Sequence, residues 1–363
     1  MQEGTALKSG TKRVVLLCFL FCLGIFQHAA AEEFREVTQD RVLQFPADFY
    51  FRPDYRLQWW YFTGHLFDKD GHEFGYELTF FVAGVQRREF RSSFGVKDIY
   101  VSHFAITDVS GKKFYFSDRS DSGAFGFAGA EQTRLKVWVA GNLMEGKPEK
   151  IRLHASGEGM AADLVLSPVK PLVLHGDKGY SRKAEDSPLS ASWYFSYTDM
   201  ATEGTLKTGD AVRGVSGKSW FDREISAGRM GQGQKGWDWF SIQLDDGREI
   251  MLYNMRKADG TIDRYSSGTF VHRDGSSRHL ASADFSITVL RHYTSVQTGA
   301  RYPALWEIRI PSEGLVLKVT PLVEAQEFVA THSTGNHYWE GACAVASVDG
   351  STGGRAYAEM TGY

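Results

Sequence analysis

The 363-residue chain has few cysteines and few prolines. It contains three cysteines and nine prolines, and Cys18 and Cys22 both lie in one apolar run near the N-terminus. If that run is removed on export, only Cys343 remains, so the mature protein forms no internal disulfide and its core must be stable without one. Cys343 lies in the apolar segment Ala342 to Val345, which is typical of a buried small hydrophobic residue rather than a nucleophile.

The sequence also lacks an apolar run long enough to span a bilayer. The longest run, Val14 to Phe26, covers about 13 residues, whereas a transmembrane helix needs roughly 20. Basic residues precede this run, and three alanines that end at Ala31 follow it, which is the pattern of a cleaved secretory signal peptide. We therefore expect a signal peptide at 1–31, a periplasmic or extracellular mature protein, and no remaining membrane segment. An uncleaved anchor is the alternative.

An excess of basic charge is absent as well. Residues 1–31 hold three of the 41 lysines and arginines and one of the 44 acidic residues, which leaves the mature chain with a formal charge of −5. Without a basic patch, nucleic acid is not an expected partner. The chain has no H-E-x-x-H and no paired C-x-x-C motif, and its histidines are scattered. We therefore expect no metal and no cofactor. The oligomeric state stays open.

Aromatic residues and glycines are abundant and indicate strands. Aromatic residues make up 14% of the chain and there are 38 glycines. Polar and apolar residues alternate in segments such as Tyr76 to Phe80 and Trp306 to Ile310, and Asp-Gly pairs that favour hairpin turns separate such segments. The pattern predicts an all-β protein, with short helical candidates only near 85–97 and 200–210. Strands of this number can form two lipocalin-like antiparallel β-barrels or curved sheets in tandem.

One tryptophan-rich segment occurs twice. It reads QWWYFTGHL from Gln58 and GWDWFSIQL from Gly236, about 178 residues later, so that Trp59 corresponds to Trp237. A second correspondence relates Asp222 to Glu359 near the end of each half. The repeat predicts two similar domains, 32–226 and 227–363, and a junction between them. Junctions between domains are common places for a ligand pocket.

The densest group of aromatic and acidic side chains is Trp220-Phe221-Asp222-Arg223-Glu224. In a strand, Trp220, Asp222 and Glu224 point to one face and Arg223 to the other. Two carboxylates beside an indole suit acid–base catalysis, because an apolar wall raises the pKa of one carboxyl group while the other stays ionised. The candidate catalytic residues are therefore Asp222 and Glu224. The alternative is a structural ion pair with Arg223.

An apolar pocket near the junction is the second expectation. Its candidate ligand-binding residues are Trp59, Trp60, His65, Trp220, Trp237 and Asp238. The alternative for each tryptophan is ordinary packing in a barrel. The alternative for His65, which shares a face with Trp59 in an alternating strand, is a core histidine bonded to a carbonyl group.

Five segments together resemble a known family. They are QWWYFTGHL, SWFDREIS, GWDWFSIQLDDG, YPALWEIRIP and the closing YWEGACAV…AYAEMTGY. They are similar to the hydroxyneurosporene synthase (carotenoid 1,2-hydratase) family, and most closely to its secreted lipocalin-like branch, often labelled predicted hydrolase. The resemblance implies two tandem lipocalin-like domains and cofactor-free chemistry on long apolar substrates. Asp222 matches the family's aspartate, whereas Lys218 and Ser219 stand before Trp220 without the histidine that the hydratases have.

These observations lead to one functional hypothesis and two alternatives. We expect an exported lipocalin-like protein that binds an apolar, isoprenoid- or lipid-like small molecule in an aromatic-lined pocket. Asp222 or Glu224 would protonate an alkene in a hydratase or lyase reaction, and the indoles of Trp220 and Trp237 would stabilise the cation. The alternatives are a carrier without catalysis and a hydrolase that depends on the carboxylate pair.

Overall fold

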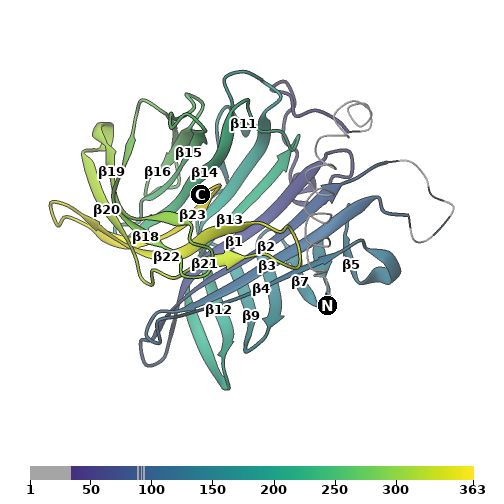
Figure 1. Ribbon diagram of the computed structural model, residues 1–363, viewed down its shortest axis with the longest axis horizontal. Coiled ribbons are helices and arrows are strands. Elements are labelled where there is room, and N and C mark those ends of the chain that lie inside the picture. Colours follow the sequence, from purple (N-terminus) through teal and green to yellow (C-terminus); the bar gives the residue numbers. More distant parts are fainter. Residues whose placement is uncertain (1–33, 88–89, 91, 93–94) are drawn as a thin grey trace, which may run out of the picture.

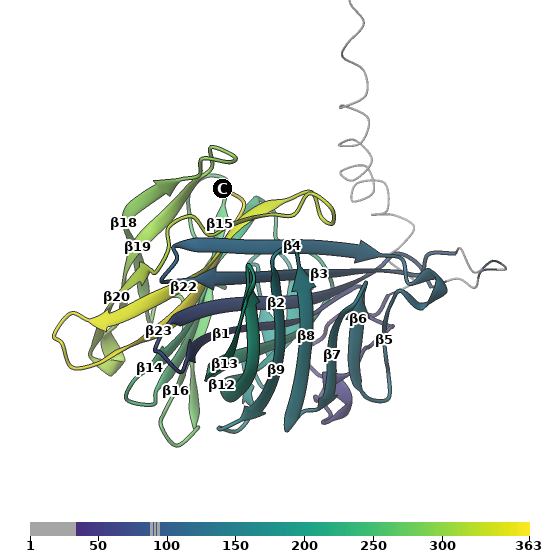
Figure 2. The ribbon, with the colours of Figure 1, turned by 90° about the horizontal axis from the view of Figure 1, so that it is seen from below.

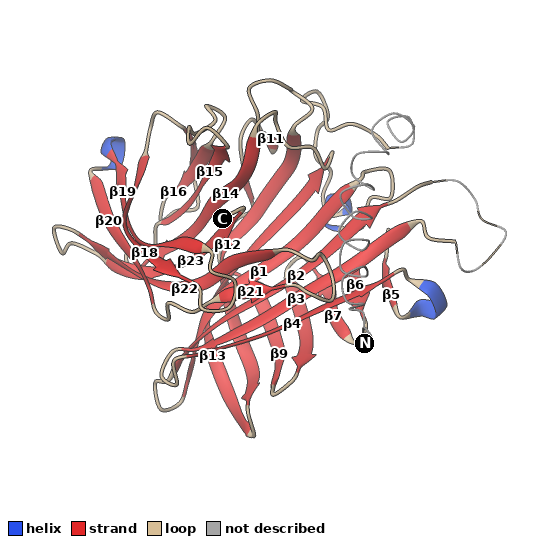
Figure 3. Ribbon diagram, viewed as in Figure 1, coloured by secondary structure: helices blue, strands red, loops and turns tan. Residues whose placement is uncertain are grey.

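The protein is built almost entirely from antiparallel strands (Figures 1 and 3). The computed structural model describes residues 34–87, 90, 92 and 95–363, so the expected signal peptide, with Cys18 and Cys22, lies outside the described residues. The helices in the described part are the 3₁₀ turns η1 (Ala47–Phe49), η2 (Ala124–Gly126) and η3 (Pro311–Glu313). None of them could cross a bilayer. The all-β prediction is confirmed.

The first sheet takes its strands from the N-terminal part of the chain. They are β1 (Leu57–Asp68), β2 (Glu73–Gly84), β3 (Asp98–Asp108), β4 (Lys113–Asp121), β5 (Ala128–Ala130), β6 (Leu135–Val139), β7 (Asn142–Lys147), β8 (Lys150–Gly157), β9 (Met160–Pro168), β10 (Val173–Leu174), β11 (Tyr180–Arg182), β12 (Ala191–Thr208) and β13 (Ala211–Ser226). Their order is β4-β3-β2-β1-β13-β12-β9-β8-β7-β6-β5, and β10 and β11 pair with β12. The helical candidate near 200–210 was therefore wrong, since most of it lies in β12.

The second sheet follows it in the sequence. Its strands are β14 (Gln234–Leu244), β15 (Glu249–Lys257), β16 (Ser267–Val271), β17 (Ser277–Ala281), β18 (Ser286–Thr294), β19 (Arg301–Ile310), β20 (Leu315–Pro321), β21 (Glu327–Val329), β22 (His337–Ser347) and β23 (Gly353–Thr361). Their order is β17-β16-β15-β14-β23-β22-β20-β19-β18, and β21 pairs with β22. The two sheets lie side by side (Figure 1). The proposed division of the chain into two domains at residue 226 stays a prediction.

Each sheet is strongly curled, as expected for lipocalin-like halves. Figure 2 shows β1 to β4 running across β8, β9 and β12 of the same sheet. The curl brings β4 close to β8, where the guanidinium group of Arg119 donates to the carbonyl oxygen of Ser156 at 2.6 Å. The inner face of each sheet holds its own apolar core. Phe62 and Phe221 belong to the first core, and Phe240 and Trp306 belong to the second.

The strand register confirms the sequence repeat. In the first sheet Tyr61 of β1 pairs with Asp222 of β13. In the second sheet Trp239 of β14 pairs with Glu359 of β23. Tyr61 and Trp239 have the same spacing as Trp59 and Trp237, so the same positions of the repeated segment occupy the same places in both sheets. The central strands of the two halves are therefore equivalent.

The outer faces of these central strands pack against each other and form a junction between the sheets. One close approach involves Gly75 of β2, where an added Cβ atom would lie 2.5 Å from the Cβ atom of Ala342 on β22. Real Cβ atoms do not approach so closely, so a side chain at Gly75 would force the two sheets apart. Glycine at this position allows the sheets to meet.

We predict that Gly75→Val lowers the free energy of unfolding by roughly 1–3 kcal/mol, the usual cost of overpacking. Urea unfolding followed by tryptophan fluorescence measures this change. The matched control is Gly214→Val on β13, where an added Cβ atom has no neighbour within 4 Å. Equal stability of the two variants would show that the sheets are not in contact at Gly75.

Candidate functional site

The junction between the sheets contains an aromatic cluster that neither inner core shares. Alternation along β1, β13 and β14 places every second side chain in the junction and the intervening ones in the inner cores. Trp59 and Trp237 are partly buried at the edge of this cluster. Its buried aromatic members are Tyr61, Tyr194, Trp220, Trp239, Tyr253 and Tyr357. Buried acidic side chains lie among these rings, and they define the candidate site.

Asp222 is the most highly hydrogen-bonded of these acids, and we call Asp222, Tyr194, Ser196 and Trp220 the Asp222 centre. The Tyr194 hydroxyl donates to Oδ2 of Asp222 at 2.6 Å, and the Trp220 indole donates to Oδ1 at 2.6 Å. The Ser196 hydroxyl also donates to Oδ1. Burial raises the pKa of Asp222 to about 7, although the three hydrogen bonds act in the opposite direction. A carboxyl group with this pKa can both give and accept a proton near neutrality.

Glu224 lies two residues further along the same face of β13. It accepts a hydrogen bond from the Ser192 hydroxyl, and the Lys183 ammonium group lies 3.4 Å from its Oε2. Burial alone would lower the pKa of Lys183, but the charge and hydrogen bond of Glu224, together with the charges of Tyr253 and Asp222, outweigh it and the pKa is raised. Lys183 also lies over the rings of Tyr194 and Tyr253, at 4.8 and 4.2 Å. The two neighbouring acids therefore differ, because Glu224 has a cationic partner and Asp222 has neutral donors.

Arg223 does not pair with either acid. It points into the first core, where its guanidinium group lies 3.9 Å over the Trp60 ring and donates to Gln58 Oε1 at 2.8 Å and to the Tyr50 carbonyl group at 2.9 Å. The alternative of a structural ion pair with Arg223 is therefore not what holds Asp222 and Glu224 in place. Sequence alternation predicted this separation.

A second group of acids faces the same junction, and we call Glu77, Glu340, Glu359 and Tyr61 the Glu340 centre. Glu77 and Glu340 are buried, and Glu359 is half-buried. The Tyr61 hydroxyl donates to Oε1 of Glu340 at 2.7 Å. Burial and the charges of Glu359 and Glu77 raise the pKa of Glu340 well above its ordinary value. Burial also raises the pKa of Glu359 to about 7. Glu340 and Glu359 therefore keep their protons to a higher pH than exposed acids do, which limits the repulsion between them.

The two centres are tied together by reciprocal hydrogen bonds. Tyr61 of the first sheet donates to Glu340 of the second. Trp239, which occupies the position of Tyr61 in the repeat, donates from the second sheet to the Tyr194 hydroxyl of the first at 3.0 Å. The Tyr61 and Trp239 rings meet edge to face, with centroids 5.2 Å apart. Each sheet thus supplies one donor to the acid centre of the other.

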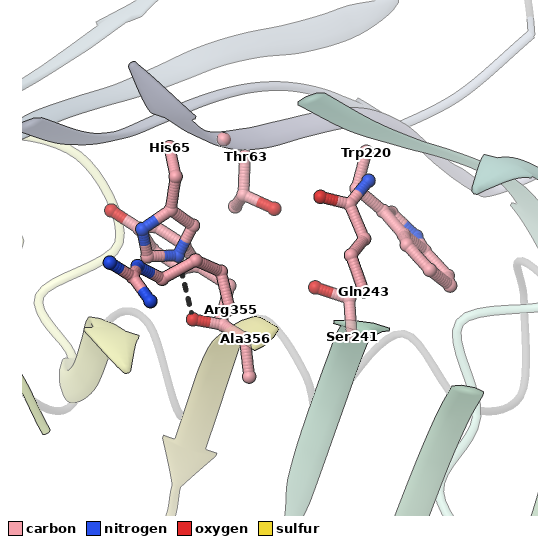
Figure 4. Close-up of a pocket in the computed structure, with 9 residues that line it drawn as sticks. Thr63, His65, Trp220, Ser241, Gln243, Arg355 and Ala356 are labelled. Carbon is pink, nitrogen blue, oxygen red and sulfur yellow. Dashed lines mark hydrogen bonds between the residues drawn. The ribbon is translucent and has the colours of Figure 1, made fainter. Parts of the chain in front are cut away.

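A small void lies beside Trp220, and Figure 4 shows the residues that line it. Its volume is about 10 Å³, which is roughly enough for one water molecule. Its walls are formed by Thr63, Gly64, His65, Trp220, Ser241, Gln243, Arg355, Ala356 and Tyr357. The His65 ring contributes to the wall near β23, where its Nε2 lies 2.9 Å from the Ala356 carbonyl oxygen. Trp220 lines the void and also donates to Asp222, so it connects the void to the Asp222 centre.

Two of the predicted pocket residues lie elsewhere, which corrects the expectation of one pocket that includes both. Trp60 is fully buried in the first core, where its indole donates to the Phe49 carbonyl oxygen at 2.7 Å. Asp238 pairs with Arg256 at 3.0 Å and accepts from the Tyr363 hydroxyl at 2.8 Å. Both residues alternate with junction residues along their strands and therefore point to the opposite face.

The described residues include one group with the ligand types of a metal site, namely Asp68, Asp70 and His72 in the turn between β1 and β2. Asp68 already accepts hydrogen bonds from the backbone amides of Asp70 and His72, at 2.9 and 3.0 Å. These bonds close the turn and explain why the three side chains are close together. We therefore assign this group a structural role.

The fold and the buried acids define a two-sheet, lipocalin-like protein with an acidic junction. The chain belongs to the AttH-like family, whose model matches residues 36–363. The crystal structure of a Nitrosomonas europaea protein described as AttH is similar, with 29% identity and a TM-score of 0.83 over 91% of this chain and 99% of that one. The resemblance inferred from the sequence is confirmed at this level.

Two fungal proteins are similar to this chain, one in sequence and one in fold. The dehydratase asqC of Emericella nidulans is 25% identical over 265 residues, which cover 68% of this chain and 71% of that protein. Kievitone hydratase of Nectria haematococca shares the fold, with 14% identity and a TM-score of 0.68 over 90% of this chain and 95% of that one.

The raised pKa of Asp222 predicts how stability depends on pH. The folded protein binds this proton more tightly than the unfolded chain, so the free energy of unfolding falls as the pH rises from about 4 to about 7. We predict that Asp222→Asn removes part of this slope. The change in unfolding free energy that is lost between pH 4 and pH 7 is on the order of 4 kcal/mol, because each of these three pH units corresponds to about 1.4 kcal/mol. Urea unfolding at pH 4, 5, 6, 7 and 8 measures it.

Glu203→Gln is the control for this experiment, because Glu203 lies exposed on the neighbouring strand β12. It should keep the slope of the unaltered protein. An Asp222→Asn slope equal to that of the control would mean that Asp222 does not bind its proton more tightly in the folded state.

Proposed function

We propose that the protein is a cofactor-free hydro-lyase that adds water to, or removes it from, an apolar substrate, with Asp222 as the proton donor. The observation that carries this proposal is the Asp222 carboxyl group, which is buried among aromatic rings and has a pKa raised to about 7. The relatives named dehydratase and hydratase support the reaction class. An isoprenoid- or lipid-like substrate fits the aromatic lining. Export of the protein is also part of the proposal, and only the signal-peptide pattern at 1–31 supports it.

The side chains at the Asp222 centre supply the groups that hydration of an alkene needs. The Asp222 carboxyl group gives its proton to one alkene carbon, and a cation develops at the other carbon. The indoles of Trp220 and Trp239, with centroids 6.3 Å apart, stabilise this cation with their ring faces. Water then attacks the cation and loses a proton to the carboxylate of Asp222 or Glu224. Dehydration is the same sequence in reverse.

Access to the site requires the two sheets to separate locally. Pockets for organic ligands have volumes of roughly 300–1,000 Å³, whereas the described void measures about 10 Å³. The junction in this structure is therefore closed to an organic ligand. An enzyme and a carrier would both have to open this junction to admit a ligand. Closure excludes bulk water, which suits a reaction through a cation.

The experiment supplies acyclic isoprenoid alkenes and tertiary alcohols to the purified protein in H₂¹⁸O and follows the products by mass spectrometry. We predict that hydration products carry ¹⁸O. In a parallel reaction in D₂O, deuterium should appear on the neighbouring carbon. Asp222→Asn should lower turnover by at least the 10²-fold typical of a lost general acid. It should leave substrate binding, measured by quenching of tryptophan emission, close to that of the unaltered protein.

Glu203→Gln again serves as the control and should retain full activity. Turnover that persists in Asp222→Asn would remove Asp222 as the proton donor. Tight binding of these compounds with no turnover by the unaltered protein would instead favour the carrier. Release of an acid and an alcohol from an ester probe, dependent on Asp222 and Glu224, would favour the hydrolase.

A further inference from the structure

A buried histidine next to the Asp222 centre has no role in the reaction described above. His175 directly follows the short strand β10 and is fully buried. Its side chain contacts both sheets. Nε2 lies 2.7 Å from the Ser196 hydroxyl on β12, and Nδ1 lies 2.8 Å from the Thr269 hydroxyl on β16. A hydrogen-bonded chain therefore runs from the second sheet through His175 and Ser196 to Asp222.

The direction of this chain follows from the number of available protons. Burial lowers the pKa of His175 well below its ordinary value, so the ring is neutral at pH 7 and has one donor and one acceptor nitrogen. The Ser196 hydroxyl has a single proton, and it donates this proton to Asp222. Nε2 of His175 must therefore be the donor to Ser196, and Nδ1 accepts from Thr269.

His175 also holds a second hydrogen-bond donor of Asp222, namely Tyr194. Its ring packs against the Tyr194 ring, with centroids 4.1 Å apart. Its backbone amide donates to the Tyr194 carbonyl oxygen at 3.0 Å. Two of the three donors to Asp222, Ser196 and Tyr194, are thus held by one residue. Trp220 is the third donor and does not depend on it.

We propose that His175 is a positioning residue of the Asp222 centre, which holds the Ser196 hydroxyl as a donor to Asp222 and so keeps the acid able to release its proton. This inference rests on the proposed function for its purpose, but the arrangement itself can be measured without a substrate. Without the Nε2–H donor, Ser196 is able to rotate and accept a hydrogen bond from protonated Asp222. The proton would then be held more tightly, and proton transfer to an alkene would be slower.

Other charged groups face this chain and stay in place when His175 is replaced. Lys183 and His279 act on His175 through their charges. Glu224 faces Asp222 from the same strand, and Glu359 faces this pair from the second sheet. Because these groups are unchanged in the variants below, they do not account for a shift in the titration of Asp222.

The first test determines the ring form of His175 in the unaltered protein. ¹⁵N chemical shifts of labelled histidine separate the Nε2–H form, the Nδ1–H form and the charged ring, and His175→Gln assigns the signal. We expect the neutral Nε2–H form from pH 7 to pH 8. A charged ring or the Nδ1–H form in this range would overturn the proposal. The only variant that this test requires to fold is His175→Gln.

The second test follows the C=O stretch of the protonated Asp222 carboxyl group by infrared difference spectroscopy, with Asp222→Asn as the blank. In His175→Phe the midpoint of the Asp222 titration should rise by about one pH unit, which means that Asp222 binds its proton about tenfold more tightly. His175→Gln keeps one donor and one acceptor and should restore the midpoint of the unaltered protein. A merely structural role would lower the melting temperature of His175→Phe and leave its midpoint unchanged, which would contradict the proposal.

A double variant separates the Ser196 bond from other effects. In a Ser196→Ala background, His175→Phe should produce no further change in the midpoint, because the hydroxyl that it positions is gone. An equal shift in both backgrounds would show that His175 acts on Asp222 by another route. The midpoint is measured in the absence of substrate, so failure of the hydro-lyase proposal and failure of this one are distinguishable.

Discussion

The structure depends on the contact between two sheets whose outer faces contain acidic side chains. Packing these faces removes Asp222 and Glu340 from water and leaves Glu359 half-buried, and a buried carboxylate is costly unless it is protonated or paired. Lys183 pairs with Glu224, whereas the pKa values of Asp222 and Glu359 rise to about 7. The same contact that holds the halves together therefore produces groups that exchange protons near neutrality.

The two acid centres share a geometry but differ in chemistry. Asp222 has a serine at the paired position on the next strand, Ser196, which leaves it as a single acid with neutral donors. Glu359 has Glu340 at the corresponding position, so the second centre contains acids that raise each other's pKa. Only the first centre combines one carboxyl group with a fixed set of donors. This difference is why the reaction is assigned to Asp222.

Local patterns in the sequence predicted much of this arrangement. The repeat gave the equivalence of Tyr61 and Trp239, and alternation along β13 separated Asp222 from Arg223 correctly. The same alternation, applied to Trp60 and Asp238, would have excluded both from the junction. His175 could not be found in this way, because its partner Thr269 is 94 residues away and only the packing of the sheets brings the two together.

The reciprocal donors, Tyr61 to Glu340 and Trp239 to Tyr194, have a consequence for how such a chain can change during evolution. Two identical subunits related by a two-fold axis make each contact twice, so every substitution alters both copies at once. Covalent fusion of the halves removes that restriction. Ser196 and Glu340 occupy corresponding positions, yet one is neutral and the other acidic. A symmetric dimer could not carry that difference, whereas a tandem chain can specialise one centre and keep the other as its support.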